Sequence, residues 1–165
     1  MHKKKLNLLG FSHESLVVFF NSIKQPKFRA TQLMKWIHQR GVLDFMEMTD
    51  FSLSLRERLA HLAVIKPPIV EECLLSSGGT QKYLIKLDSG SMIEMVKIPE
   101  KKRLTLCISS QVGCALQCTF CATGAQGFER NLESSEIIGQ LWLANHYNQP
   151  SQTVSNVVFM GMGEP

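Results

Sequence analysis

The chain has 165 residues, of which 44% are hydrophobic and 19% are charged. This length fits one domain, or a small domain joined to part of a larger one, and the apolar fraction excludes a disordered chain. No apolar run approaches the roughly 18 residues of a membrane span, and the basic start at residues 1–5 is not followed by the apolar segment of a secretory signal. We therefore expect a cytoplasmic protein with no membrane partner.

Charge and cysteine content give two further indications. Residues 1–70 hold 11 Lys and Arg against 5 Asp and Glu, and such a basic half is compatible with a polyanionic partner such as nucleic acid. The five cysteines cannot all pair within one chain. In a reducing compartment, thiols more often serve metals or chemistry than disulfides.

The first 65 residues predict three short helices. Ser12 can cap the first, whose apolar residues recur at helical spacing as far as Pro26. The second runs from about Phe28 to Gly41, and Ser52 can cap the third. The second helix also has a basic side, which is either a solvated face or one that faces RNA. This side comprises Lys27, Arg29, Lys35, His38 and Arg40.

Beyond Lys66-Pro67-Pro68, the pattern changes from helices to strands, because consecutive prolines end a helix and stiffen a linker. Residues 81–87 and 91–98 predict two antiparallel strands, joined by turn-forming residues at 88–90. Residues 104–109 predict a further strand.

The last part of the chain predicts a helix and another strand. Ser134 or Ser135 can cap the helix, which Pro150 follows, and residues 154–160 are an apolar, β-branched run suited to a strand buried on both faces. Strand, helix and strand form a βαβ unit, the opening of a parallel α/β sheet or barrel. One such unit cannot close a barrel and leaves a strand edge unpaired, so we expect an N-terminal segment of a longer protein.

Three cysteines, Cys114, Cys118 and Cys121, lie within eight residues in the spacing C-x3-C-x2-C. Thiolates are soft ligands that select zinc or iron–sulfur clusters. A structural zinc site normally takes four protein ligands, whereas three thiolates suit a four-iron cluster with one iron free for an external chelator. The loop also lies between a predicted strand and helix, where α/β barrels build active sites. A zinc-bearing, non-catalytic RNA-binding module is the alternative.

The cysteine loop, with Phe120 before its last cysteine, resembles the signature of radical S-adenosylmethionine enzymes. The ending Gly163-Glu164-Pro165 resembles the second motif of that superfamily. The flanking segments are similar to the RlmN/Cfr family, whose members methylate an aromatic carbon of adenine in RNA, and the resemblance covers nearly the whole chain. These segments are residues 36–41, 107–114, 121–124 and 136–140.

This resemblance implies an α/β fold in three parts. Residues 1–66 would form a small helical RNA-engaging domain, and residues 67–103 a linker and an antiparallel β-hairpin. Residues 104–165 would form the first part of a radical-SAM (β/α) barrel, namely strand 1, the cluster loop, helix 1 and strand 2.

The resemblance also implies two cofactors. A 4Fe-4S cluster would be held by Cys114, Cys118 and Cys121, and S-adenosyl-L-methionine would bind its open iron. Gly163 and Glu164 match the residues that hold the amino group of this cofactor. The chemistry is reasonable, because an ammonium needs oxygen acceptors and glycine lets the backbone come close.

Two residues outside the cysteine loop match family residues with catalytic roles. Glu94 matches the proton acceptor; from the residues alone, a carboxylate between apolar neighbours is either a solvated edge residue or a functional acid with a raised pKa. Cys107 matches the thiol that resolves a covalent enzyme–RNA adduct, although a buried core thiol would otherwise be expected. Cys73 has no comparable context, and we expect a structural role for it.

The function implied is that of a radical-SAM methyltransferase acting on C2 of adenine in 23S rRNA and in tRNA, through a methyl-cysteine and a covalent adduct. An electron donor such as flavodoxin and a monomeric parent protein are expected with it. Methylation at C8 of the same base, as in resistance-conferring relatives, is the alternative within the family. The methyl-carrying cysteine is not among these 165 residues, so we expect the segment to be inactive by itself.

Overall fold

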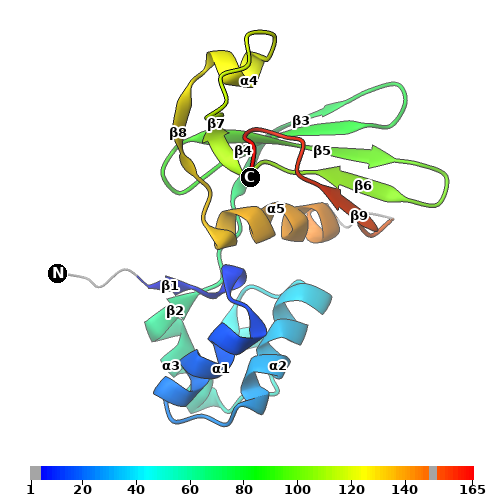
Figure 1. Ribbon diagram of the computed structural model, residues 1–165. Helices are drawn as coiled ribbons and strands as arrows, with labels where there is room; N and C mark the ends of the chain where they lie inside the picture. Colours follow the sequence, from blue (N-terminus) through cyan, green and yellow to red (C-terminus); the bar gives the residue numbers. More distant parts are fainter. Residues whose placement is uncertain (1–4, 149–151) are drawn as a thin grey trace. The chain divides into compact units, whose positions relative to one another are not determined.

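The computed structural model describes residues 5–148 and 152–165. The first four residues of the basic start and Pro150, predicted to follow the last helix, lie outside the described residues. The chain divides into two compact units, Met1–Lys66 and Pro67–Pro165, so residues 67–103 and 104–165 share the second unit (Figure 1). None of the helices in the described ranges is long and apolar enough to cross a bilayer.

The first unit is a small set of helices closed by a short parallel strand pair. In chain order it contains β1 (Leu6–Asn7), a 3-10 turn (Leu8–Gly10), α1 (His13–Ser22), α2 (Phe28–Met34), a π-helical turn (Lys35–Gln39), a 3-10 turn (Phe45–Glu47), α3 (Leu53–Leu62) and β2 (Ala63–Val64). Strands β1 and β2 pair in parallel. The hydrophobic pattern does not predict this pair, because each strand is only two residues long.

Hydroxyl caps begin α1 and α3 as predicted. Ser12 accepts a hydrogen bond from the backbone N–H of Ser15, and Ser52 accepts one from that of Leu55. The apolar side chains of the three helices and of the segments that join them form the core of the unit. Its fully buried members include Leu16, Phe20, Leu33, Ile37, Phe51 and Leu59.

The second unit is built on a mixed sheet of five strands in the order β3-β4-β5-β6-β9. These strands are β3 (Ile69–Leu75), β4 (Gln81–Lys86), β5 (Met92–Pro99), β6 (Leu104–Cys107) and β9 (Asn156–Val158). The first four pair antiparallel, and β6 pairs with β9 in parallel. Helix α5 (Ser134–His146) lies between β6 and β9 in the chain, so the predicted βαβ unit is present.

Helix α5 lies along one face of the sheet (Figure 1), and the core of the unit is between them. Ile85, Ile93 and Met95 point to this buried face, together with Leu106 of β6 and Leu143 of α5. Because successive side chains of a strand alternate between faces, the residues between them point to the other face, which is only partly buried.

A second, smaller sheet stands between β6 and α5 in the chain. Strands β7 (Gln111–Gly113) and β8 (Phe128–Asn131) pair antiparallel, and the short helix α4 (Ala122–Ala125) lies between them in the sequence. The sequence pattern predicts neither this sheet nor β3. In these segments polar residues or glycine interrupt the regular spacing of apolar residues that marks a helix or a strand.

The last strand differs from its prediction. It extends over three residues where residues 154–160 were expected, and Val157, Phe159 and Met160 are 41%, 45% and 79% exposed. The prediction of burial on both faces is therefore wrong for this chain. The reason is that β9 is an edge strand, and β6 is its one partner among the residues that the structure describes.

The start of α5 also differs from its prediction. Glu133 is the N-cap in place of a serine, and Glu136 completes a capping box with it. The carboxylate of Glu136 accepts the N–H of Glu133 at 2.8 Å and both guanidinium nitrogens of Arg130 at 2.8 and 2.9 Å. This capping box moves the helix start one residue ahead of the serine pair.

Candidate functional site

The cysteine loop runs from β7 to α4 and is folded by its own backbone. The N–H of Cys114 donates to the carbonyl of Gly127 at 2.9 Å, and the N–H of Cys121 donates to that of Cys118 at 3.1 Å. Cys114 is buried, while Cys118 and Cys121 are partly exposed, and none of the three is in a disulfide. The three predicted ligands therefore lie on one short loop, on which Cys118 and Cys121 are partly exposed and Cys114 is buried.

The chemistry of these donors suits a thiolate-bound iron–sulfur group. The pKa of Cys121 is lowered, mainly because the backbone N–H of Gly124 and that of Thr123 donate to its sulfur, and the thiolate is the form that binds metals. Within the described ranges, no three His, Cys, Asp or Glu side chains are close enough together to hold a metal ion. The residues thus fit the group chemically, although the structure does not gather the three sulfurs around a common point.

The Gly163-Glu164 segment lies against β7, the strand that leads into the cysteine loop. The carbonyl of Met162 accepts the N–H of Ser110 at 2.9 Å and that of Gln111 at 3.1 Å. Gly163 has a φ of 92°, and a Cβ on it would lie 2.5 Å from the Cβ of Gln111, so only glycine fits this position. The two predicted cofactor-binding residues are therefore held beside the strand that precedes Cys114.

Glu94 and Cys107 lie on the same face of the large sheet, the face opposite α5. Val96 shares a face with Glu94 and is directly paired with Cys107 across β5 and β6. The carboxylate of Glu94 forms an ion pair with Lys82 at 2.7 Å, and its side chain is 42% exposed. The structure thus brings the two predicted catalytic side chains to neighbouring positions.

Cys107 is partly buried on the sheet. Burial raises its pKa, and this effect outweighs the hydrogen bond from the backbone of Met160, which lowers it. A raised pKa keeps this group as a thiol at neutral pH.

A buried polar network, which the sequence does not predict, connects these elements. The hydroxyl of Ser109 donates to the carbonyl of Glu94 at 2.6 Å and accepts the N–H of Met162 at 2.8 Å. The side chain of Gln140, on α5, accepts the N–H of Ser109 at 2.9 Å and donates to its carbonyl at 3.0 Å. The one feature of the sequence that could have indicated this network is the polar run 109–111, directly after an apolar strand.

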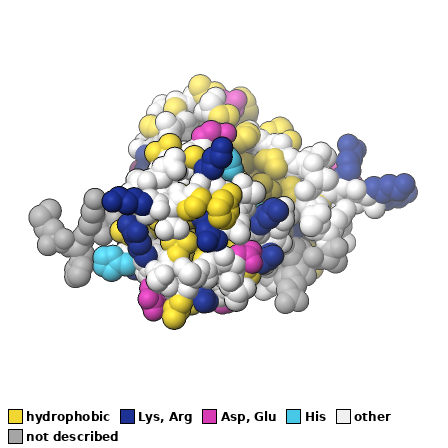
Figure 2. Space-filling model, turned by 90° about the horizontal axis from the view of Figure 1, so that it is seen from below, with side chains coloured by type: hydrophobic (Ala, Val, Ile, Leu, Met, Phe, Trp, Pro, Cys, Tyr) yellow, Lys and Arg dark blue, Asp and Glu magenta, His cyan; other side chains and the backbone are white. Residues whose placement is uncertain are grey.

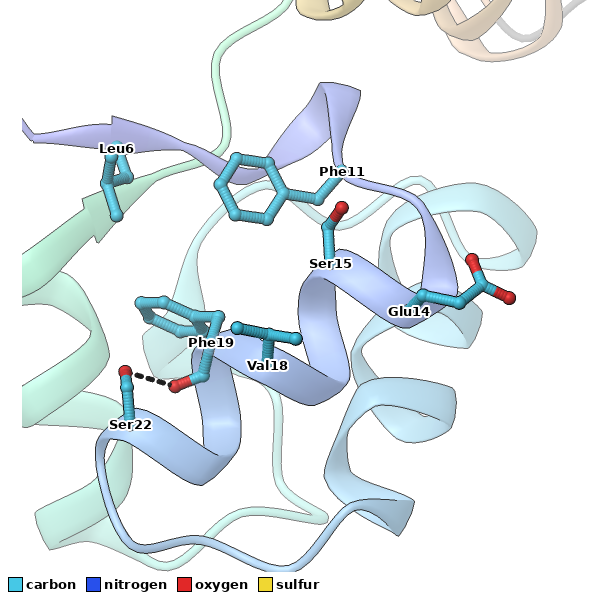
Figure 3. A pocket seen from close by; sticks show the side chains of 7 residues that line it. All are labelled: Leu6, Phe11, Glu14, Ser15, Val18, Phe19 and Ser22. Atoms are coloured by element: carbon cyan, nitrogen blue, oxygen red, sulfur yellow. Dashed lines mark hydrogen bonds between the residues drawn. The ribbon is translucent and has the colours of Figure 1, made fainter.

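The first unit has a surface hollow of about 470 Å³ that contains none of the predicted site residues (Figure 3). Leu6, Phe11, Val18 and Phe19 line it, and Glu14 contributes the one carboxylate. The lining has no group of nucleophilic or metal-binding side chains, so the hollow offers no chemistry by itself.

The predicted basic side of the second helix is partly used within the first unit. The guanidinium of Arg29 donates to Gln32 and to the carbonyl of Asp50, both at 2.8 Å. Arg40 lies 3.9 Å above the ring of Trp36. Figure 2 shows Lys and Arg side chains spread among apolar and acidic ones on the face it presents, not gathered into one patch.

Comparisons with known proteins indicate the class of protein to which this fold is similar. A solved radical SAM methyltransferase from Sphaerobacter thermophilus is similar with a TM-score of 0.87 and 33% identity, over 97% of this chain and 48% of that chain. Residues 6–65 match the family model for the ribosomal RNA large subunit methyltransferase N-terminal domain. The mixed α/β fold is therefore similar to that of part of a radical SAM methyltransferase.

Curated relatives give the family. The chain is 52% identical over 169 residues to the dual-specificity RNA methyltransferase RlmN of Marinomonas sp., and 51% identical over 166 residues to that of Saccharophagus degradans. These matches cover 98% of this chain, and 46% and 42% of the relatives, so the chain spans less than half of their length. Together with the match to the N-terminal domain model, these similarities support an N-terminal fragment of the RlmN type.

Proposed function

We propose that this chain provides the RNA-engaging domain and the cluster-binding part of a radical SAM methyltransferase that methylates C2 of adenine in 23S rRNA and in tRNA. The observation that carries the proposal is the three-thiol loop placed one strand away from Gly163-Glu164, in a chain about half identical to RNA methyltransferases. In this proposal residues 104–165 are the start of a radical-SAM barrel, and residues 1–66 engage RNA.

Five residues would hold the cofactors. Cys114, Cys118 and Cys121 would bind a 4Fe-4S cluster, which when present supplies the electron that cleaves S-adenosyl-L-methionine. Gly163 and Glu164 would accept hydrogen bonds from the ammonium of that cofactor, through a backbone carbonyl and a carboxylate. The partial exposure of Cys118 and Cys121 supports this role, because a cluster has to reach these residues from solvent.

The two side chains on the open sheet face would complete the reaction. Glu94, held by Lys82, would accept the proton from the methylated ring carbon. The thiol of Cys107 would lose its proton and attack the sulfur of the enzyme–RNA adduct, so that a sulfur–sulfur bond forms as the carbon–sulfur bond breaks. The released carbon would take up a proton and become the methyl group of the product.

Anaerobic reconstitution with iron and sulfide tests the cluster assignment. We expect a brown protein that absorbs broadly near ~400 nm, and loss of this absorbance in Cys118→Ser and Cys121→Ser. Cys73→Ser is the matched control, since Cys73 lies on β3, away from the cysteine loop. A colourless protein that binds one zinc tightly would contradict the proposal and favour a zinc-bearing RNA-binding module.

An RNA methylation assay tests the activity. The reconstituted chain with S-adenosyl-L-methionine, reductant such as flavodoxin, and ribosomal or transfer RNA is expected to give no catalytic product, because no methyl-carrying cysteine is among its residues. The full-length parent is expected to act as a monomer and to produce 2-methyladenosine, identified by mass spectrometry of the nucleosides. An 8-methyl product would support the alternative specificity within the family.

A further inference from the structure

Gln111, the first residue of β7, contacts both segments on which the proposed cofactor site depends. Its side-chain oxygen accepts the N–H of Ala115, next to Cys114, at 3.2 Å and the N–H of Glu164 at 3.4 Å. Its side-chain nitrogen donates to the amide oxygen of Asn131 on β8 at 2.9 Å. Only 7% of Gln111 is exposed, so a single buried amide joins three separate segments.

The segment that contains Gly163 packs directly on the side chain of Gln111. A Cβ on Gly163 would lie 2.5 Å from both the Cβ and the Cγ of Gln111. The backbone N–H of Gln111 also donates to the carbonyl of Met162 at 3.1 Å. The segment therefore cannot shift toward β7 without displacing Gln111.

A primary amide suits these contacts better than an apolar side chain. The oxygen serves two N–H donors, and glutamine provides a donor for Asn131 at the same time. Without that oxygen, two backbone N–H groups lose their acceptor, and an unpaired donor in a partly buried site is costly. Because the amide of Gln111 binds Ala115, Glu164 and Asn131, it can act on the proposed site through these partners.

We infer that Gln111 is a positioning residue that couples the cysteine loop to the Gly163-Glu164 segment, so that ordering one segment orders the other. This inference rests on the proposed function, because the coupling matters to the reaction only when a cluster and a cofactor occupy these two segments. The coupling itself is a property of the protein without either group.

Hydrogen exchange measured by mass spectrometry on the whole chain tests the inference. In Gln111→Met, the amides of Ala115 and Glu164 are expected to exchange about three- to ten-fold faster, the loss of one hydrogen bond each. In Gln111→Glu, which keeps an oxygen acceptor, both are expected to stay within about two-fold of the unchanged chain. Gln111→Asn, one methylene shorter, repeats the test if the Met variant does not fold.

Lys97→Met is the matched control, because Lys97 is a buried polar side chain of the same unit whose amine donates to Ala144. It is expected to leave both amides unchanged. Equal exchange at Ala115 and Glu164 in Gln111→Met and the unchanged chain would overturn the inference.

A second arm uses the chain loaded with iron and sulfide. Loading is expected to slow exchange at Glu164 in the unchanged chain and not in Gln111→Met, and protection that persists in that variant would overturn the coupling. Failure of the unchanged chain to take up a cluster counts against the proposed function instead. The hydrogen-exchange comparison of the metal-free variant and the metal-free unchanged chain would still test the inference.

Discussion

Lys97 is a charged residue in the core of the second unit. It is 6% exposed on β5, and its amine donates to the carbonyl of Ala144 at 3.1 Å. Burial lowers its pKa below the ordinary value of 10.5. Between the lowered pKa and 10.5 the unfolded chain therefore binds more protons than the folded chain, and the stability of the fold rises as the pH rises through this range.

Lys97→Met removes the buried charge and keeps the length of the side chain. We expect the free energy of unfolding at about pH 7 to rise by about 1–2 kcal/mol, because the cost of burying the ammonium disappears. The increase in stability as the pH rises toward 10.5 is expected to shrink as well. Urea denaturation at a series of pH values from neutral to about 10.5 checks this.

The control for this prediction is Lys86→Met. Lys86 is half exposed and pairs with Glu71 at 3.2 Å, so its loss is expected to change stability by less than about 1 kcal/mol. A Lys97→Met variant less stable than the unchanged chain at neutral pH would show that the hydrogen bond to Ala144 outweighs the cost of burial.

Gly163→Ala tests how tightly the cofactor segment packs. Gly163 and Gly90 have similar φ values, 92° and 89°, but a Cβ on Gly90 would meet nothing within 4 Å. Gly90→Ala is therefore expected to lower the free energy of unfolding by about 1–2 kcal/mol, through backbone strain alone. Gly163→Ala is expected to lower it by about 1–3 kcal/mol more, because of the clash with Gln111. Thermal melting of both variants measures the difference, and equal costs would contradict the packing described.

At the scale of elements, the start of α5 is stabilised by one carboxylate with several partners. Glu136 accepts hydrogen bonds from Arg130 and from the N–H of Glu133, and its side chain is 14% exposed. Partly buried, bidentate pairs of this kind are stronger than exposed ion pairs. The orientation of α5 on the sheet, and with it Gln140, depends on this helix start.

Glu136→Ala is expected to destabilise the chain by about 1–3 kcal/mol, because Arg130 and the N–H of Glu133 both lose their acceptor. Glu100→Ala is the matched control, since its pair with Arg103 has side chains 50% and 65% exposed and is worth less than about 1 kcal/mol. Denaturant titration compares the two variants. Equal effects would show that the capping box contributes little.

At the scale of the whole molecule, the first unit is closed by contacts between its two ends. Leu6 pairs with Ala63 across β1 and β2. The side chain of Asn7 accepts the N–H of Lys66 at 3.0 Å and donates to its carbonyl at 2.8 Å. With its own buried core, this unit meets the usual conditions for independent folding.

A chain of residues 1–66 alone is therefore expected to be helical and to melt cooperatively, with modest stability because of its size. Circular dichroism during thermal unfolding measures this. Phe20→Ala removes a fully buried aromatic side chain. It is expected to lower the free energy of unfolding by about 3–5 kcal/mol, which abolishes the cooperative transition. A gradual, non-cooperative melt of the unchanged segment would contradict the prediction.

Much of the local structure follows from the sequence, because it depends on near neighbours in the chain. Ser12 and Ser52 cap helices as predicted, and the turn residues 88–90 join β4 and β5. The parallel pairing of β6 with β9 also agrees with the βαβ pattern. By contrast, Glu133 takes the cap expected of a serine, since Glu136 and Arg130 favour that start.

Features made of near neighbours in the chain can be predicted from the sequence: three thiols on one loop, a glycine and a carboxylate after a strand, and two helix caps. Residue identity and spacing are enough for such features, because the groups involved are close along the chain. The contact between Gln111 and Glu164, 53 positions apart, and the link that Ser109 makes between Glu94 and Met162 became visible only in the folded chain. Contacts of this kind depend on the path of the whole chain and on which elements cover each strand, and no local pattern encodes either.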